Sequence, residues 1–308
     1  MSNRSSMKGT WPFCAEDYLS PLAVPTGKNP DDVLNIIWRK NEVFLDVGSY
    51  NVGAGFMVLW VLVLMFSLMG YYSWNANFFN IFLVGASFII GVPFLILVRS
   101  LCQPVSLPFR FNRQRRQVWV PCENGDYWVV PWETVEAIAA QQSIFSPVGR
   151  SEFGMLFVGF NNPDDSAREN NRHQTLGFNC GCASNAVALW ECIRSYMEIG
   201  PDAVPDPLVG LGEGKQTQIN YLLSNVRQGN VSTAMYCVFC IFFLGTYFAE
   251  VIQNLKLSPP PDLPHPEIIE WSKPLPPEQW AKRSPELEVA IAQREAELGI
   301  NTTCDVSE

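Results

Sequence analysis

Ala54–Tyr72, AGFMVLWVLVLMFSLMGYY, is a long apolar run, and a second one soon follows it, Phe78–Val98, FFNIFLVGASFIIGVPFLILV. Neither run contains a charged residue, and each has about the ~20 residues that an α-helix needs to cross a bilayer. A core helix of a soluble domain would carry a polar stripe, and these runs have none. The alternative, two buried helices of a large soluble core, leaves the uniform apolarity unexplained. The sequence therefore predicts a transmembrane helical hairpin over residues 53–98.

The distribution of positive charge predicts how the hairpin is oriented. Arg39 and Lys40 precede it and Arg99 follows it, whereas residues 73–77 at its tip carry no charge. Because lysine and arginine accumulate on the cytoplasmic side, residues 1–52 and the segment after the hairpin are predicted to be cytoplasmic. The apolar spacing over residues 31–45 also predicts a short amphipathic helix before the membrane.

Two small residues in the second run, Ser87 and Gly91, have the spacing that allows close packing of transmembrane helices. They are candidate helix-packing residues, and such a face could support a homo-oligomer. The same residues are equally compatible with ordinary positions that face lipid.

Residues 99–201 read as one β-rich domain. Short runs rich in aromatic and β-branched residues predict strands at 109–112, 117–122, 127–130, 155–160 and 173–178. Asn124-Gly125 favours a tight hairpin turn between the second and third of these strands. Ser184–Ile199 then has apolar residues at helical spacing on one face. The predicted fold class is an α+β membrane protein, in which a small β-barrel or bent sheet is capped by this helix.

The last third of the chain is predicted to return to the membrane. Residues 202–231 read as a linker rich in Pro and Gly followed by a short helix, and residues 232–252 as a third transmembrane helix. Residues 253–308 form a Pro-rich tail, and Ser284-Pro285 opens a terminal amphipathic helix within it. A third span would put this tail in the periplasm, opposite the β domain.

Composition excludes several classes of function. The formal charge of −9 argues against nucleic acid as a partner. The two histidines, His173 and His265, leave little material for general-base or metal chemistry. Cys180-Gly181-Cys182 is a single C-x-C rather than the paired knuckles of structural zinc. The sequence predicts no cofactor, no metal and no catalytic site, so the protein is not expected to be an enzyme.

Two sets of residues are candidates for recognition. A basic run just after the membrane could attract anionic headgroups, at about 1 kcal/mol per residue, or could be a solvated turn whose charges enforce topology; its members are Arg110, Arg113, Arg115 and Arg116. Three tryptophans of the β domain are candidate anchors for a protein partner, with burial in the core as the alternative; they are Trp119, Trp128 and Trp132.

The stretches Phe109–Val120, FRFNRQRRQVWV, and Val130–Val135, VPWETV, resemble the opening of bacterial PH-like membrane domains. The helix Ser184–Ile199 stands where that fold places its closing helix. The whole layout of hairpin, β domain, late membrane helix and Pro-rich tail resembles an uncharacterised bacterial inner-membrane family, often encoded beside type VI secretion spike and toxin genes.

This resemblance implies a non-catalytic protein that binds a protein partner, and most specifically an immunity protein that neutralises a cognate type VI secretion effector toxin. The alternative is a membrane-surface sensor or scaffold, which would bind anionic lipid or a resident membrane protein through its PH-like domain. The bilayer is a partner in both hypotheses.

Overall fold

The structure is a computed structural model that describes residues 14–50, 52–74, 79–122, 125–146, 149–164, 172–207 and 218–299. The chain divides into two compact units. The first comprises Met1–Gly48, Leu107–Pro207 and Leu263–Glu308, and the second comprises Ser49–Ser106 and Leu208–Asp262. Each stretch of the second unit is thus an insertion into the first, and the first unit is completed by the last residues of the chain.

A five-stranded antiparallel sheet of the first unit has the order β2-β3-β4-β5-β6. Its strands are β2 (Ile37–Lys40), β3 (Phe44–Val47), β4 (Phe109–Asn112), β5 (Gln117–Pro121) and β6 (Tyr127–Pro131). The prediction of the last three strands is confirmed. Asn124 lies outside the described residues, but the Cys122 N–H donates to the Asp126 carbonyl at 2.9 Å where β5 and β6 meet.

The helix predicted over residues 31–45 is wrong, because this stretch holds β2 and the start of β3. The side chain of Asn41 accepts hydrogen bonds from the N–H groups of Val43 and Phe44, both at 2.8 Å, and so stabilises a turn between the strands. β3 then pairs with β4, which is 62 or more residues away in sequence by the register of Val47 with Phe109. This pairing, rather than local spacing, decides the conformation. Residues 14–48 are therefore part of the first unit rather than a separate segment.

The second sheet of this unit has the order β1-β7-β8-β9, again antiparallel. Its strands are β1 (Cys14–Ser20), β7 (Glu136–Ser146), β8 (Gly149–Asn161) and β9 (His173–Asn179). The predicted strands at 155–160 and 173–178 are confirmed as parts of β8 and β9. The described strands form two sheets rather than one closed barrel, and two 3-10 turns, η1 (Trp132–Thr134) and η3 (Pro201–Ala203), lie between elements.

Helix α3 (Ala183–Glu198) confirms the predicted closing helix and packs against β7 and β8. All of its residues from Leu189 to Glu198 are buried, so the helix is covered on every side. Gly154 on β8 permits its approach, since a Cβ there would lie 2.0 Å from the carbonyl carbon of Cys182, just before the helix. The core of the first unit lies between this helix and the inner faces of the strands.

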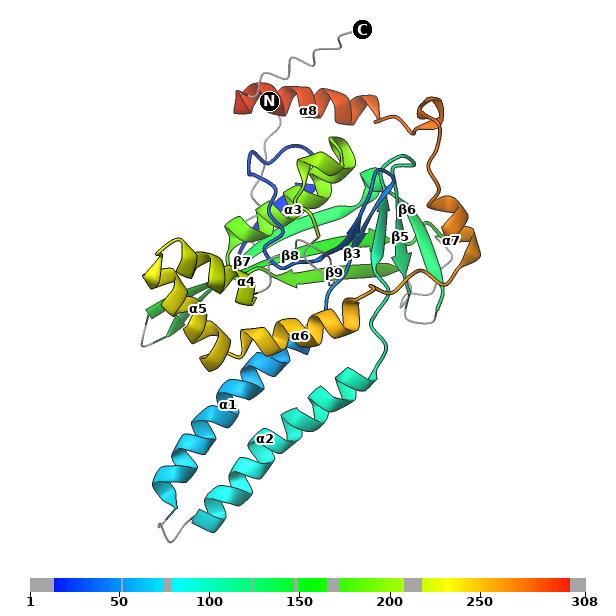
Figure 1. The fold of residues 1–308 in the computed structure, drawn as a ribbon. Coiled ribbons are helices and arrows are strands. Elements are labelled where there is room, and N and C mark those ends of the chain that lie inside the picture. Colours follow the sequence, from blue (N-terminus) through cyan, green and yellow to red (C-terminus); the bar gives the residue numbers. More distant parts are fainter. Residues whose placement is uncertain are drawn as a thin grey trace. The chain divides into compact units, whose positions relative to one another are not determined.

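The C-terminal tail folds as part of the first unit. It contains α7 (Pro266–Trp271), the 3-10 turn η4 (Pro277–Gln279) and α8 (Pro285–Leu298), and α7 lies beside β5 and β6 (Figure 1). Helix α8 begins as predicted, with the Ser284 side chain accepting from the Leu287 N–H at 3.2 Å. Because the tail packs on the sheet, it does not lie across a membrane from the β domain, and that prediction is wrong.

The second unit contains two helices that are long and apolar enough to cross a membrane, α1 (Val52–Ser73) and α2 (Phe79–Cys102). They run side by side (Figure 1), and the rings of Phe66 and Phe82 stack with centroids 5.9 Å apart. Only Gly53 and Leu59 of α1 are buried within the structure, and α2 has no buried residue. Such apolar, uncovered helices match the hairpin that the sequence predicts.

The predicted third transmembrane helix is two helices, α5 (Val231–Phe243) and α6 (Thr246–Leu257), which follow the short helix α4 (Gln218–Arg227). They bend by 68° at the break, where Gly245 has a φ of +69°. The two stretches that flank α4–α6, residues 107–207 and 263–299, pack together in the first unit. By length and composition the bent pair could still form a third span, but one complete crossing would separate these stretches, so their packing in one unit argues against it. Residues 208–217 of the predicted linker lie outside the described residues.

Candidate functional site

The basic run of the sequence forms an internal cluster in the first unit. Arg110 on β4 lies opposite Asp46 of β3 in register and donates to its carboxylate through Nε at 2.6 Å and Nη2 at 2.7 Å. Its third nitrogen donates to the Ser272 hydroxyl of the tail at 2.9 Å. The guanidinium also lies over the ring of Phe44, 3.8 Å from its centroid. A bidentate, buried arginine of this kind fixes geometry and has no free face for lipid.

Arg116 makes the second ion pair of the cluster. It ends the turn between β4 and β5 with a φ of +49°, which is unusual for a residue with a long side chain. Its guanidinium donates to both carboxylate oxygens of Glu198, at 3.1 and 2.9 Å, and to Glu133 at 3.1 Å. These bonds hold the backbone in the left-handed region. The pair joins the β4–β5 turn to the last turn of α3.

Glu198 is the centre of this cluster and links it to the tail. Besides Arg116, it accepts from the indole N–H of Trp132 at 2.7 Å and from Arg283 of the tail at 2.6 Å. Burial alone would raise the pKa of Glu198, but these donors and positive charges hold it below its ordinary value. Glu133 also accepts from the backbone N–H of Ser284 at 3.0 Å. The N-terminus of α8 is therefore held by two carboxylates of the β domain.

The other two arginines of the run bind backbone oxygens. Arg113 donates to the Ile199 carbonyl at 2.8 Å and its guanidinium carbon lies 5.4 Å from the ring centroid of Trp280. Arg115 donates to the Trp271 carbonyl at 3.0 Å. All four arginines that were candidates for lipid headgroups are thus engaged within the first unit, three of them with residues of the tail. The run is therefore not a freely solvated turn either, because each of its four arginines contacts other residues of the first unit.

The three candidate tryptophans are all buried. Trp128 and Trp132 belong to the main core, and Trp119 packs with Leu263 and Ile268 of the tail in a smaller cluster. None presents a surface to a partner in this structure, and the alternative of burial describes their positions. Trp119 is covered by the tail together with Tyr127 and Val129 of β6, and its indole N–H has no hydrogen-bond partner among the described residues.

The candidate helix-packing residues lie on α2 without close neighbours from the described chain. The Ser87 hydroxyl donates to the Leu83 carbonyl of its own helix at 2.7 Å, and a Cβ on Gly91 would meet open space. Their role in packing against another helix or another copy stays a prediction.

Side chains that could carry chemistry are dispersed. His173 is exposed on β9 and contacts Asn161 at 2.6 Å, whereas His265 packs against the ring of Tyr127 at a centroid distance of 4.9 Å. Burial raises the pKa of the Cys180 thiol to about 11 and also raises that of Cys192, which makes both poor nucleophiles. Within the described ranges, no group of three or more His, Cys, Asp or Glu could hold a metal ion.

Part of one edge of β8 has no strand partner among the described residues. β8 pairs with β7 from Gly159 down to Gly149 opposite Ser146, but its pairing with β9 stops at Met155 opposite Asn179. The Cys180 N–H then donates to the Gly154 carbonyl at 2.8 Å, and the chain turns away into α3. Since backbone groups alternate along a strand, those of Glu152 and Arg150 face the same edge as Gly154. No described strand runs alongside them.

Sequence reasoning missed the acidic half of the cluster, Asp46 and Glu198. A signal for the second existed: Glu191, Arg194 and Glu198 recur at helical spacing within an otherwise apolar helix. Charged residues that share a buried helix face need partners, and Arg194 does form an ion pair with Glu191. The nearest of the partners of Glu198, Trp132, is 66 residues away in sequence, so local spacing carries no sign of it.

Comparisons with known proteins add no assignment to this geometry. No protein-family model matches the chain, and neither a curated protein sequence nor a solved structure matches it.

Proposed function

We propose that this chain is a non-catalytic bacterial inner-membrane protein that is anchored by α1 and α2 and binds a protein partner. Its specific form would be an immunity protein against a cognate type VI secretion effector, as the resemblance of its layout implies. The open edge of β8 carries the proposal that a partner binds.

A strand edge with unpaired N–H and C=O groups can accept an extended segment of another protein, whose backbone then continues the sheet. Glu152 and Arg150 supply these groups, and Phe153 beside them is 40% exposed. Phe153 gives an incoming strand an apolar contact, while the backbone supplies affinity that does not depend on its sequence. This combination suits recognition of one extended segment of an effector.

The alternative function is a sensor that binds anionic lipid through the basic run, and the contacts of these arginines do not support it. Arg110 and Arg116 are buried in ion pairs, and Arg113 and Arg115 hold backbone oxygens. Freeing one of them for a headgroup would leave a buried carboxylate unpaired or an end of the tail released. A scaffold that binds a resident membrane protein stays compatible with the β8 edge.

The proposed orientation follows the positive charges next to the hairpin. Arg39, Lys40 and Arg99 flank α1 and α2, which favours the cytoplasm for the first unit. Since residues 263–299 pack within that unit, the tail is proposed to be cytoplasmic as well. An effector that meets this surface would act from the cytoplasm or at the inner face of the membrane.

Site-specific photo-crosslinking tests partner binding by this edge. The full chain, carrying p-benzoylphenylalanine in place of Phe153, should give a discrete adduct with one protein in the cell membrane fraction. The same probe in place of Tyr18, an exposed aromatic residue on β1 at the opposite side of the sheet, should not give it. Glu152→Pro removes an outward N–H and should abolish the adduct, whereas Glu152→Ala keeps that N–H and should preserve it.

The immunity form has its own test. Bacteria that lack this chain should lose a competition against otherwise identical bacteria that deliver the cognate effector. Wild-type chain and Glu152→Ala should restore survival, and Glu152→Pro should not. Equal survival with and without the chain would refute immunity. Absence of a specific adduct at Phe153 would refute the proposal that the β8 edge binds a partner.

A further inference from the structure

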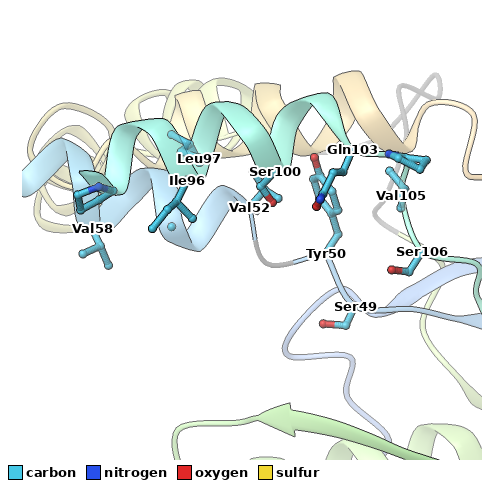
Figure 2. Close-up of a pocket in the computed structure, with 13 residues that line it drawn as sticks. Ser49, Tyr50, Val52, Val58, Ile96, Leu97, Ser100, Gln103, Val105 and Ser106 are labelled. Carbon is cyan, nitrogen blue, oxygen red and sulfur yellow. The ribbon is translucent and has the colours of Figure 1, made fainter. Parts of the chain in front are cut away.

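A cleft of about 570 Å³ lies within the second unit, between the start of α1 and the end of α2 (Figure 2). Its volume is within the range of roughly 300–1,000 Å³ that is usual for small-molecule sites. Its walls change character along α2. Pro93, Ile96 and Leu97 form an apolar end, and Ser100 and Gln103 form a polar end one to two turns later. The cleft therefore spans the change from apolar to polar surroundings.

Tyr50, which precedes α1, supplies a polar group without a partner. Its hydroxyl is buried and makes no hydrogen bond to any described residue. Figure 2 shows the tyrosine reaching from the chain before α1 to the last turn of α2, beside Gln103. Burial raises the pKa of Tyr50, so this hydroxyl stays protonated and can donate a hydrogen bond. A buried donor without a partner costs about 1–3 kcal/mol and calls for a ligand oxygen.

We propose that this cleft binds one glycerophospholipid of the surrounding bilayer. One acyl chain would lie against Ile96, Leu97 and Val58, and the ester oxygens would accept hydrogen bonds from Tyr50 and Gln103. None of the residues that line the cleft is charged. The site therefore recognises the neutral glycerol-ester region, and the phosphate and headgroup remain in water. Binding is expected to be indifferent to the charge of the headgroup.

This inference rests on the proposed insertion of α1 and α2 in a membrane, because only there is a phospholipid presented to the cleft. Gly55 gives a direct way to test it. It lines the cleft, and a Cβ at this position would lie 4.0 Å from the nearest atom, Cδ1 of Leu97. Gly55→Leu therefore fills the cleft without a clash at the backbone, and it also replaces glycine with a better helix former.

Gly85 offers a matched control on the same hairpin. It lies on α2, does not line the cleft, and has nothing within 4 Å of a Cβ. Gly85→Leu thus makes the same chemical change on an open face of a helix. A third variant, Tyr50→Phe, removes only the hydroxyl group.

The experiment is native mass spectrometry of the full chain, purified from membranes of phosphatidylcholine or of phosphatidylglycerol and stripped of loosely held lipid with detergent. We expect one phospholipid per chain with either headgroup. Gly55→Leu should lower its occupancy by about tenfold or more, since the side chain takes the place of the acyl chain. Tyr50→Phe should weaken retention by about 3- to 10-fold, and Gly85→Leu should leave it unchanged.

Equal retention by Gly55→Leu and Gly85→Leu, or no retained lipid in the wild type, would overturn the proposal. Extraction of the same membranes with alkaline carbonate separates this from a failure of membrane anchoring. A chain that stays in the pellet but retains no lipid refutes the lipid site alone. A chain that leaves the pellet refutes the membrane insertion on which both proposals depend.

Discussion

Replacing Glu198 by glutamine should destabilise the first unit strongly. The Glu198 side chain is 1% exposed and that of its partner Arg116 is 8% exposed, so the substitution leaves a buried guanidinium with only Glu133 as an acidic partner. Removing one member of a buried ion pair costs about 3–5 kcal/mol. The loss also releases Arg283 of the tail, whose 34% exposed pair adds at most about 1 kcal/mol.

Opening of this unit can be measured at Cys192, which is fully buried in α3. In a full-length variant that keeps this cysteine alone, maleimide should react only after the first unit opens. A loss of about 3–5 kcal/mol corresponds to labelling that is roughly 100- to 5,000-fold faster in Glu198→Gln at equal urea concentration. Glu278→Gln is the control, because Glu278 is an exposed glutamate of the same tail, and a surface change should stay within about 0.5 kcal/mol.

The effect should depend on pH in a defined direction. The pKa of Glu198 is lower in the folded protein than its ordinary value of 4.5, so its charge contributes stability that is fully present above pH 4.5. That contribution is lost as the pH falls towards the folded pKa. The difference between wild type and Glu198→Gln should therefore shrink below pH 4.5. A difference under about 1 kcal/mol at neutral pH, or one that persists unchanged in acid, would refute the reasoning.

Three further predictions concern the close approach on β8, the tail and the topology. Gly154→Ala should lower the free energy of unfolding of the first unit by about 2 kcal/mol or more, because the new Cβ would lie 2.0 Å from the carbonyl carbon of Cys182. Labelling of Cys192 measures this loss. A chain truncated after residue 262 should show tryptophan emission that is shifted to the red, since the tail covers the Trp119 indole. The shift should disappear when Trp119→Phe is added, and an unshifted spectrum of the truncated chain would contradict this packing. Single cysteines at Thr175 on β9 and Val289 on α8, both exposed, should react with an impermeant maleimide from the same side of the membrane, and opposite sides would disprove the shared unit.

Local patterns were sufficient for elements whose neighbours in space are neighbours in sequence. β4, β5 and β6 follow one another through short turns, and α3 has an apolar face that its own spacing reveals. β7 escaped notice because Glu136–Ser146, EAIAAQQSIFS, is rich in alanine and glutamine, which are poor strand signals. It forms a strand because β1 and β8 flank it.

The candidate site was harder to predict, because the contacts of its arginines are made with residues that are distant in sequence. The arginines were recognised as a cluster, but whether they face lipid or carboxylates depends on residues such as Asp46 and Glu198. Several tail contacts join positions more than 150 residues apart, as between Asn112 and Trp271. No period or motif reports such a contact. The same limit applies to the predicted third membrane helix. Its residues are apolar, but it bends by 68° at Gly245, and the packing of residues 263–299 within the first unit argues against a full crossing.

The division of the first unit into three stretches of chain has a consequence for the order of synthesis. β3 must wait for β4 until residues 49–106 have been made, and Trp119 gains its tail contacts only after α7 has left the ribosome. The apolar helices α1 and α2 are thus made before the five-stranded sheet can assemble, and that sheet is covered only after residues 263–271 have been added. A nascent chain that stalls or is cut short displays an uncovered indole and unpaired arginines, which are features that a quality-control protease can recognise.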